Sequence, residues 1–252
     1  PERMSAAIDM LWPGAPRGLS DDALIDSLAV AAPTVRANFV ASIDGAATRD
    51  GRSGGLSGAA DKRHFELLRR VSDVVLVGAG TVRDEGYGPM LVDEASQLWR
   101  ERHGMPRHPV FAIVSGHLDL DPTSPIFTEA PVRPIVITTT GTDTTAFAAV
   151  AHVVAVGDEH ADLAAALAAV RAMGHAQVLC EGGPSLFAAM LAADLIDELC
   201  LTVAPSLEGG DGPRIVGGDI PARSMRLLHV LRGGEELLLR YARALPTRTL
   251  VE

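Results

Sequence analysis

The sequence has little of several residue types on which common functions depend. Of its 22 basic residues only Lys62 is a lysine, and the other 21 are arginines. Lysine chemistry, including the lysine of a phosphate-binding loop and most Schiff-base mechanisms, is therefore excluded at every other position. Aromatic residues are also scarce, with two Trp, two Tyr and six Phe among 252 residues. So few aromatic rings argue against a stacking surface for single-stranded nucleic acid.

Long apolar runs and an excess of positive charge are missing as well. No apolar stretch approaches the roughly 18–20 residues that a membrane span needs. The formal net charge is -10, from 22 basic and 32 acidic residues. An acidic chain has no general attraction to nucleic acid or to an anionic membrane. We therefore expect a soluble globular protein that binds a small molecule, with no nucleic acid and no membrane as partner.

Cysteine is limited to Cys180 and Cys200, which lie in apolar runs and form no C-x-x-C pair. Both are typical of buried small hydrophobic residues. The chain begins Pro-Glu-Arg-Met, without a basic stretch followed by an apolar one. We expect a sequence trimmed at its start, no secretory signal and a cytoplasmic location. The eight histidines have no metal-ligand spacing, and neither G-x-S-x-G nor a calcium loop occurs, so we predict no metal site and no serine hydrolase.

From residue 34 onward, apolar strand-like runs alternate with helical segments, and Gly233-Gly234 separates the last two runs as in a hairpin. We predict an α/β fold in three layers, with a mostly parallel central sheet, helices on both faces and a C-terminal antiparallel hairpin. Residues 1–33 are predicted to be a variable lead-in and 34–252 a single domain. The predicted strands are 35–42, 74–77, 110–114, 135–138, 153–156, 177–180, 199–203, 226–232 and 235–241. The predicted helices are 21–32, 58–70 with Ser57 as its cap, 94–103, 162–173 and 184–193.

Loops that follow predicted strands are candidate sites, because ligands of open α/β sheets bind at the carboxyl ends of strands. After residues 74–77 come Gly78 and Gly80, which let backbone amides approach a ligand, and Thr81, which can begin a helix facing an anion. Neither a Rossmann fingerprint nor a phosphate loop is present there. A tight strand-to-helix turn explains these glycines equally well.

A second strand ends at Glu181, followed by Gly182-Gly183-Pro184-Ser185. Free amides at the start of the following helix can hold a pyrophosphate. A carboxylate at a strand end must be paired or exposed, so we favour a functional role for Glu181 over a packing role.

Two further polar groups have weaker signals. Ser42 and Asp44 follow the first predicted strand, although Asp-Gly is common in plain turns. Asp61 and His64 lie one helical turn apart beside Phe65. An isolated carboxylate on a helix is usually only solvated.

Several motifs, in this order along the chain, resemble the pyrimidine reductases of riboflavin synthesis. They are NFVASIDG at 38–45, DVVLVGAGTV at 73–82, EGGPSL at 181–186, LIDE at 195–198 and APSLEGG at 204–210. The resemblance covers roughly 35–241. It implies a dihydrofolate-reductase-like fold, NADPH as hydride donor and a homodimer. In this family the hydride converts the ribosyl group of an aminopyrimidine phosphate, such as 5-amino-6-(5-phosphoribosylamino)uracil, into a ribityl chain.

The resemblance also implies roles for matching positions. The cofactor would lie along the first glycine loop, and the second would hold its pyrophosphate. The implied cofactor-binding residues are Gly78, Gly80, Thr81, Val82, Glu85, Gly182, Gly183, Pro184 and Ser185. On the substrate side, the predicted catalytic residues are Asp61, Glu181 and Asp44, and the predicted substrate-binding residues are Asn38, Ser42 and His64.

This chain departs from the family pattern in two places. The family commonly has T-V-R-A-D-x-P-x-L after the glycine loop, whereas residues 81–89 are TVRDEGYGP. Glu85 stands in for the aspartate, and the displaced proline implies a differently shaped loop. Asn38 stands where many bacterial enzymes have lysine, and it resembles archaeal and fungal-type reductases. Deaminase motifs are missing, so we expect a stand-alone reductase.

Two other functions stay open at this point. The string DKRHF at 61–65 is similar to the helix of true dihydrofolate reductases in which one acid holds the pterin ring. The substrate would then be a dihydropterin, with Asp61 as the binding acid. Alternatively, the chain binds NADPH without turnover. The arginine that contacts the 2′-phosphate of NADPH is not identified, although Arg83 lies next to the cofactor loop.

Overall fold

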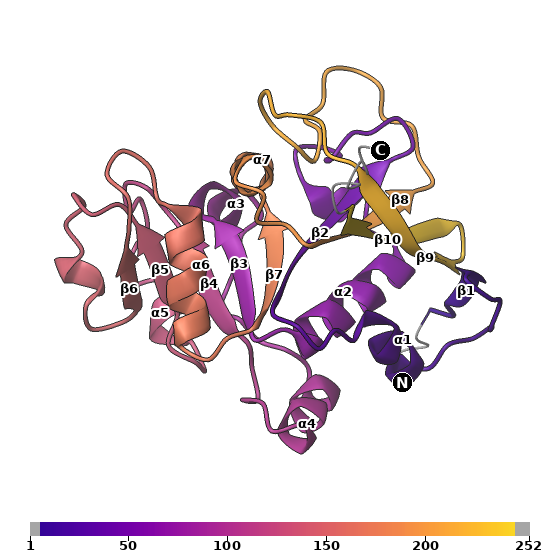
Figure 1. Cartoon of the computed structure of the whole chain (residues 1–252), viewed down its shortest axis with the longest axis horizontal. Helices are drawn as coiled ribbons and strands as arrows, with labels where there is room; N and C mark the ends of the chain where they lie inside the picture. Colours follow the sequence, from indigo (N-terminus) through magenta and orange to yellow (C-terminus); the bar gives the residue numbers. More distant parts are fainter. Residues whose placement is uncertain (1–5, 245–252) are drawn as a thin grey trace, which may run out of the picture.

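The computed structural model describes residues 6–244, and within them the strands form one sheet in the order β1-β9-β10-β8-β2-β7-β3-β4-β5-β6 (Figure 1). The strands are β1 (Asp9–Trp12), β2 (Thr34–Ser42), β3 (Val74–Gly78), β4 (Val110–Val114), β5 (Ile135–Thr138), β6 (His152–Ala155), β7 (Gln177–Gly182), β8 (Glu198–Ala204), β9 (Met225–Gly233) and β10 (Glu236–Arg243). The helices are α1 (Asp21–Leu28), α2 (Ala59–Val71), α3 (Ala79–Asp84), α4 (Glu94–Arg102), α5 (Pro125–Thr128), α6 (Leu163–Ala172) and α7 (Pro184–Ala192), with short 3-10 turns η1 (Ser53–Gly55) and η2 (Thr145–Phe147).

The sheet is parallel over most of its width and antiparallel at one end. β2 pairs in parallel with β7 and β8, and the parallel ladder continues from β7 through β3, β4, β5 and β6. β10 pairs antiparallel with both β8 and β9, and β1 pairs antiparallel with β9. The predicted mostly parallel sheet with a C-terminal antiparallel hairpin is therefore confirmed.

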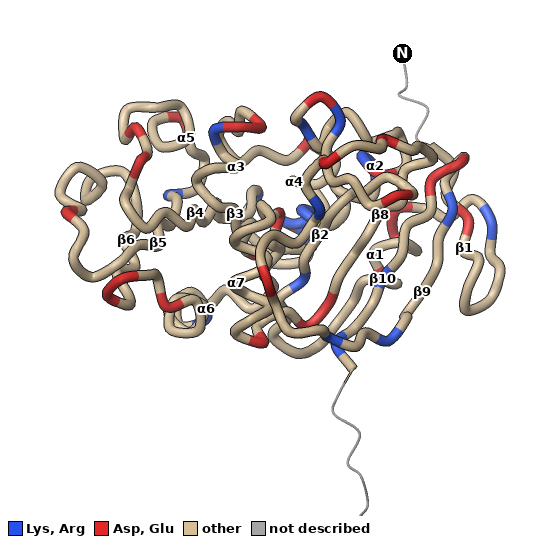
Figure 2. The backbone as a smooth tube through the Cα atoms, turned by 90° about the horizontal axis from the view of Figure 1, so that it is seen from above, with Lys and Arg blue, Asp and Glu red and all other residues tan. Residues whose placement is uncertain are grey.

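Helices cover both faces of the parallel part. Val35 and Ala37 of β2 belong to an apolar core that includes side chains of α6 and α7. Val75 and Val77 of β3 belong to a second core that includes side chains of α2, α3 and α5. Figure 2 places α6 and α7 on one side of the sheet and α2, α3 and α5 on the other. Burial on both faces explains why these strands are apolar without alternation.

The N-terminal segment joins the same structure. β1 extends the sheet beside β9, and α1 packs on α2, where Ile8 and Leu24 share a core with Leu231. The sequence analysis did not predict β1, because a four-residue run that ends before Pro13 is too short to show a period. The predicted helix 21–32 ends earlier, at Leu28. Both elements lie within the predicted lead-in, whose variability stays a prediction.

The start of α2 differs from its prediction. Gly58 is the N-cap residue, and no side chain of the N-cap residue satisfies the helix amides. The carboxylate of Glu236 accepts hydrogen bonds from the amides of Gly58 at 2.8 Å and Ala60 at 3.0 Å. The prediction that Ser57 caps this helix is therefore wrong. Because the residue that caps α2 lies 178 positions away in the sequence, no local pattern indicates this cap.

No helix within residues 6–244 is both long enough and apolar enough to cross a membrane.

Candidate functional site

A cleft opens where β2 and β7 end, between α2 and the loops that follow β3 and β7. It has a volume of about 670 Å³. This is the edge of the sheet at which the sequence analysis expects a ligand. The cleft is large enough for a small-molecule ligand together with part of a cofactor.

One face of α2, together with Ser57 two residues before the helix, forms a wall of this cleft. Ser57, Asp61, Phe65 and Arg69 all line it, at a spacing of four residues. Side chains spaced by four lie on the same face of a helix, so this stripe follows directly from helix geometry. Lys62, the sole lysine, lies beside the stripe and also lines the cleft.

Asp61 is the most unusual carboxyl in the cleft. It is only 5% exposed, and its side chain hydrogen-bonds with the hydroxyls of Ser57 and Thr202. Burial raises the pKa of Asp61, and the negative charge of Glu236 raises it further, whereas the two hydroxyls and Lys62 act in the opposite direction. The net pKa shift is upward, so Asp61 keeps its proton to a higher pH than an ordinary aspartic acid.

Glu181 also lines the cleft, but it is fully paired. Arg69 donates two hydrogen bonds to its two carboxylate oxygens, each at 2.6 Å, and the Tyr87 hydroxyl donates a third at 2.8 Å. The Arg69 guanidinium lies over the Phe65 ring at 4.2 Å. Burial, together with Glu181, raises the pKa of Tyr87, which therefore remains a neutral donor. Glu181 thus holds Arg69 and Tyr87 in place in the wall of the cleft, and the charge of Arg69 balances its own.

Asn38 provides an unused acceptor. Its side chain is 9% exposed and lines the cleft, and its Oδ1 atom is buried without a hydrogen-bond partner among the described residues. A buried amide oxygen without a partner costs free energy unless a bound molecule donates to it. Asn38 is therefore suited to an N–H or O–H group of a ligand.

Two glycine loops meet at the other end of the cleft. Thr81, Gly183 and Pro184 line it, and a side chain on Gly183 would overlap the Thr81 hydroxyl. Gly182 has φ +92°, and a Cβ there would lie 2.9 Å from the Phe39 ring, so only glycine fits. The N-cap residue of α7, Gly183, has no side chain to satisfy the first amides, which are available to an anion such as a diphosphate.

The remaining predicted cofactor residues lie around these loops, and four of them do not line the cleft. Gly78 caps α3, Val82 is buried in the core, and neither Gly80 nor Ser185 borders the cavity. Glu85 does line it, and one of its oxygens accepts the Ser53 amide at 2.8 Å. This contact ties the segment before α2 to the end of α3, and both residues line the cleft. The direct cofactor contacts predicted for these residues remain predictions.

Asp44 and Ser42 do not line the cleft. The Ser42 hydroxyl donates to Asp44 at 2.5 Å, and the amide of Gly209 donates to Asp44 at 2.7 Å. These bonds, with the Glu208 amide, lower the pKa of Asp44 to about 2. The pair joins the turn after β2 to the loop after β8. The catalytic role predicted for Asp44 and the substrate contact predicted for Ser42 remain predictions.

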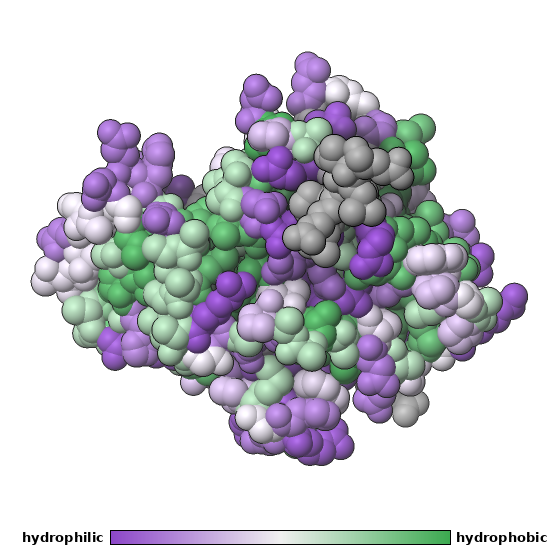
Figure 3. Space-filling model, in the orientation of Figure 1, coloured by the Kyte–Doolittle hydropathy of each residue, from purple (hydrophilic) through white to green (hydrophobic). Residues whose placement is uncertain are grey.

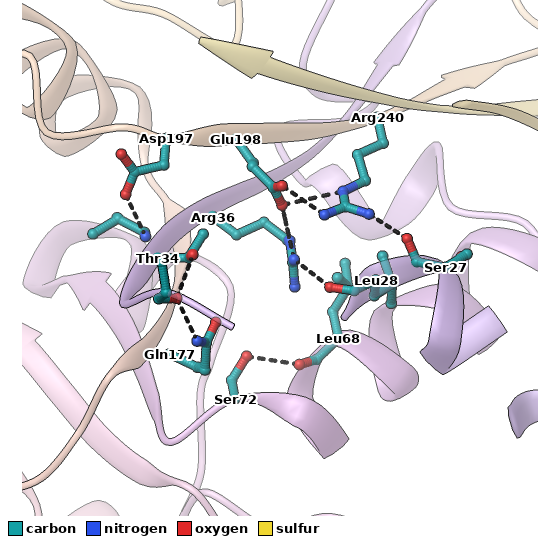
Figure 4. A network of polar contacts seen from close by, with 12 residues as sticks. Ser27, Leu28, Thr34, Arg36, Leu68, Ser72, Gln177, Asp197, Glu198 and Arg240 are labelled. Atoms are coloured by element: carbon teal, nitrogen blue, oxygen red, sulfur yellow. Dashed lines mark hydrogen bonds and ion pairs between the residues drawn. The ribbon is translucent and has the colours of Figure 1, made fainter. Parts of the chain in front are cut away.

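His64 lies behind the cleft wall, in a buried polar cluster. Glu198 accepts hydrogen bonds from Arg36 at 2.8 Å and from Arg240 at 2.5 Å, and Figure 4 shows it between the two guanidiniums. His64 and His229 lie near these arginines, and each has a buried Nε2 atom without a partner among the described residues. His64 does not line the cleft, so its predicted substrate contact remains a prediction.

These histidines make the folded state sensitive to acid. Burial, the other histidine and the two arginines lower the pKa of His64 to about 3, and burial with Arg240 lowers that of His229 to about 4. Because unfolded histidine binds a proton near pH 6.5, the free energy of unfolding is expected to fall as pH drops from 6.5 toward 4. The loss per histidine is about 1 kcal/mol for each pH unit. Urea unfolding at pH 7 and pH 5 measures it.

The matched controls for this prediction are His229→Asn and His117→Gln. The first removes one of the two buried groups and is expected to flatten the dependence on pH. The second removes an exposed histidine and is expected to leave the dependence unchanged. An equal slope in the wild type and in His229→Asn would contradict the assignment.

The sequence analysis did not single out Arg69, Tyr87 or Ser57 as site residues. For Ser57 and Arg69 a signal was available, since they continue the four-residue spacing of Asp61 along α2. Tyr87 lies in a loop whose shape no local pattern indicates. Its contact with Glu181 depends on the tertiary structure alone.

Comparisons with known proteins agree on one family. The model of the family described as "RibD C-terminal domain" matches residues 33–239. A protein of Archaeoglobus fulgidus named 2,5-diamino-6-ribosylamino-4(3H)-pyrimidinone 5′-phosphate reductase is 26% identical over 209 residues, which cover 81% of this chain and 94% of that protein. A protein of the same name from Methanothermobacter thermautotrophicus is 28% identical over 218 residues, covering 83% and 97%.

Solved structures resemble this chain over most of its length. A pyrimidine reductase-like protein from Corynebacterium diphtheriae superposes with a TM-score of 0.77 at 26% identity, covering 84% of this chain and 92% of that one. A riboflavin biosynthesis reductase from Saccharomyces cerevisiae superposes with a TM-score of 0.62 at 18% identity, covering 86% and 92%. The second likeness is one of fold.

Proposed function

The chain belongs to the RibD C-terminal domain family, and from this premise we propose that it is an NADPH-dependent reductase of a phosphoribosylaminopyrimidine. The proposal rests mainly on one observation: Asp61, Asn38 and residues of the two glycine loops line the same cleft. The predicted family and the predicted dihydrofolate-reductase-like fold are both confirmed.

The cofactor proposal rests on the glycine-loop end of the cleft. Gly183, with the first-turn amides of α7, suits a diphosphate, and Thr81 faces it from the neighbouring loop. When bound, the nicotinamide cofactor supplies a hydride. Because Gly183 has no side chain, its backbone can lie close to a bound diphosphate. Preference for NADPH over NADH is the finer part of the proposal.

The substrate proposal rests on the other end. The two archaeal relatives are named as reductases of a diaminopyrimidinone carrying a ribosylamino 5′-phosphate. Such a ring presents amino and ring N–H donors, which match the free Oδ1 of Asn38. Arg69 and Glu181 hold the wall between the two ends rigid. The reacting carbon and the hydride donor would thereby be held next to each other.

We assign to Asp61 the donation of the proton that the reaction requires. Reduction of the ribosyl group adds a hydride to C1′, breaks the bond from C1′ to the ring oxygen and requires one proton on that oxygen. Asp61 is the one carboxyl lining the cleft for which both burial and a raised pKa are found, so it keeps its proton to a higher pH than an ordinary aspartic acid. Its carboxyl group donates that proton and is reprotonated from solvent after turnover.

The deciding experiment measures oxidation of NADPH and NADH by the purified protein. The substrates are 2,5-diamino-6-ribosylamino-4(3H)-pyrimidinone 5′-phosphate, its deaminated uracil analogue and dihydrofolate. Rapid oxidation with a pyrimidine phosphate supports the proposal. Because Asp61 faces the cleft from a helix, as a pterin-binding acid would, dihydropterin reduction is the second candidate, and turnover of dihydrofolate alone would favour it. NADPH binding without turnover of either substrate would favour a non-catalytic role.

We also propose that the chain forms a homodimer through the face of β8–β10 opposite to α2. Half-buried apolar side chains line that face, as Figure 3 shows on the right, around the position of β8 and β9 in Figure 1. They include Leu201, Val203, Val230, Leu239 and Tyr241. Light scattering is expected to give twice the 26.4 kDa of one chain, and Leu239→Asp to give one chain. A monomeric wild type would contradict the proposal. The cytoplasmic location stays a prediction.

A further inference from the structure

We propose that Glu236, the first residue of β10, is a positioning residue that holds the first turn of α2, and with it the Asp61 carboxyl, in the orientation that proton donation needs. The inference rests on the proposed function, in which Asp61 supplies the proton. Glu236 lies outside the reaction cleft, so it acts through Asp61 and touches neither substrate nor cofactor.

The contact is a helix cap made by a side chain from a distant part of the sequence. One carboxylate oxygen of Glu236 accepts the Gly58 amide at 2.8 Å, and the other accepts the amides of Ala60 at 3.0 Å and Asp61 at 3.4 Å. Glu236 is 6% exposed. The same residue whose side chain faces the cleft therefore donates its own backbone amide to Glu236, which couples the two carboxyl groups directly.

The contact with Glu236 requires glycine at position 58. A Cβ built at Gly58 would lie 2.5 Å from the Glu236 carboxylate, although its backbone angles suit any residue. Glycine is therefore needed at this position for the approach of Glu236 and not for a turn. The sequence before α2 is thus adapted to receive a carboxylate from β10.

Other helices of the chain are capped differently. Asp162 caps α6 by accepting the amides of Ala164 and Ala165, two and three residues further on. Such a local cap needs no partner from another element. In α2 the cap instead fixes the helix to the sheet beside β8, whose Thr202 pairs with Leu238 and binds the Asp61 side chain. The start of α2, the β9–β10 hairpin and Asp61 are therefore linked by direct contacts.

The charge of Glu236 has a second consequence. The groups that face Asp61 are Glu236 from β10, the Thr202 hydroxyl from β8, and Ser57 and Lys62 at the start of α2. After burial, Glu236 is the group that raises the pKa of Asp61, whereas the other three act to lower it. Removal of its negative charge is thus expected to lower the pKa of Asp61.

Glu236→Gln tests the charge, because the amide retains one acceptor oxygen for the cap. The titration of Asp61 can be followed in the free protein by NMR of labelled aspartate carboxyls, with Asp61→Asn to assign the signal. The expected result is a midpoint at lower pH than in the wild type. In the active enzyme, the pH above which kcat declines is expected to move down by the same amount.

Glu236→Asp tests the geometry, because it keeps the charge and shortens the side chain. It is expected to lower kcat by about tenfold or more, with little change in KM. Asp162→Ala, which removes the local side-chain cap of α6, is the control for a general loss of stability and is expected to change neither kcat nor the Asp61 midpoint.

Two outcomes would overturn the inference. One is an unchanged Asp61 midpoint in Glu236→Gln, and the other is a wild-type kcat in Glu236→Asp. Should Glu236→Gln not fold, Glu236→Asp still provides the second comparison. A wild-type protein that fails to reduce any pyrimidine phosphate would contradict the proposed function instead, and the NMR titration would remain a test of the coupling between Glu236 and Asp61.

Discussion

Asp61→Asn is expected to lower kcat for reduction of the pyrimidine ribose phosphate by about 10²- to 10⁴-fold, the range typical of a lost general acid. Asparagine keeps the size of the side chain and can still bond with Ser57 and Thr202, but it has no carboxyl proton to give. Stopped-flow or steady-state oxidation of NADPH measures kcat. NADPH affinity, measured by fluorescence titration, is expected to stay close to that of the wild type.

The matched control is Glu66→Gln, the same change of carboxyl to amide on the exposed side of α2. It is expected to leave kcat and the affinity for NADPH unchanged. A kcat of Asp61→Asn within threefold of the wild type would remove Asp61 from the mechanism. If dihydrofolate is the true substrate, the same variant loses dihydrofolate reduction, so both substrates need to be assayed.

Glu198→Ala is expected to lower the free energy of unfolding by about 3–5 kcal/mol, the usual cost of breaking a buried ion pair. Its carboxylate is buried between Arg36 and Arg240, whose side chains are 5% and 6% exposed. Removal of Glu198 leaves two guanidiniums buried without their counter-charge. Arg36 would keep its bond to the carbonyl of Leu28, which satisfies one donor and not the charge. Urea unfolding at pH 7 measures the loss.

Two comparisons show whether burial is the cause. Glu101→Ala breaks a pair with Arg107 in which the side chains are 46% and 54% exposed, and its expected cost is below about 1 kcal/mol. Replacement of the whole cluster by Arg36→Met, Glu198→Leu and Arg240→Met is expected to cost less than Glu198→Ala alone, since no unpaired charge remains. Equal losses for Glu198→Ala and Glu101→Ala would refute the explanation.

The pH dependence of Glu198 has a definite sign. Burial raises its pKa, but the hydrogen bonds and charges of Arg240 and Arg36 outweigh burial, so the net shift is downward. Its contribution to stability is therefore present above the pKa of an unfolded glutamate, near 4.3, and is lost as pH falls through the lower folded value. The loss from His64 and His229 begins near pH 6.5, whereas the loss from Glu198 begins only near pH 4.3, so above about pH 5 the histidines alone contribute to the change.

The sequence alone determined the fold class, the family and the two ends of the site. Buried strands are continuous apolar runs, and glycines that follow them are local features, so the parallel sheet and the loops around Gly78 and Gly183 were predicted from neighbouring residues. Asp61 was predicted as a candidate because residues 61–65 resemble the helix of dihydrofolate reductases in which one acid holds the pterin ring. Each of these signals lies within a few consecutive residues.

Only the tertiary structure decided which candidates share a cleft. Asp61, Asn38 and Glu181 meet there, whereas Ser42 and Asp44 join two loops and His64 faces a buried cluster. The pairing of Arg69 with Glu181, 112 positions apart, and the cap of α2 by Glu236 depend on the register between α2 and the sheet. Burial and distant charges set the pKa of Asp61, and no local pattern in a sequence contains that information, because it arises when separate elements pack together.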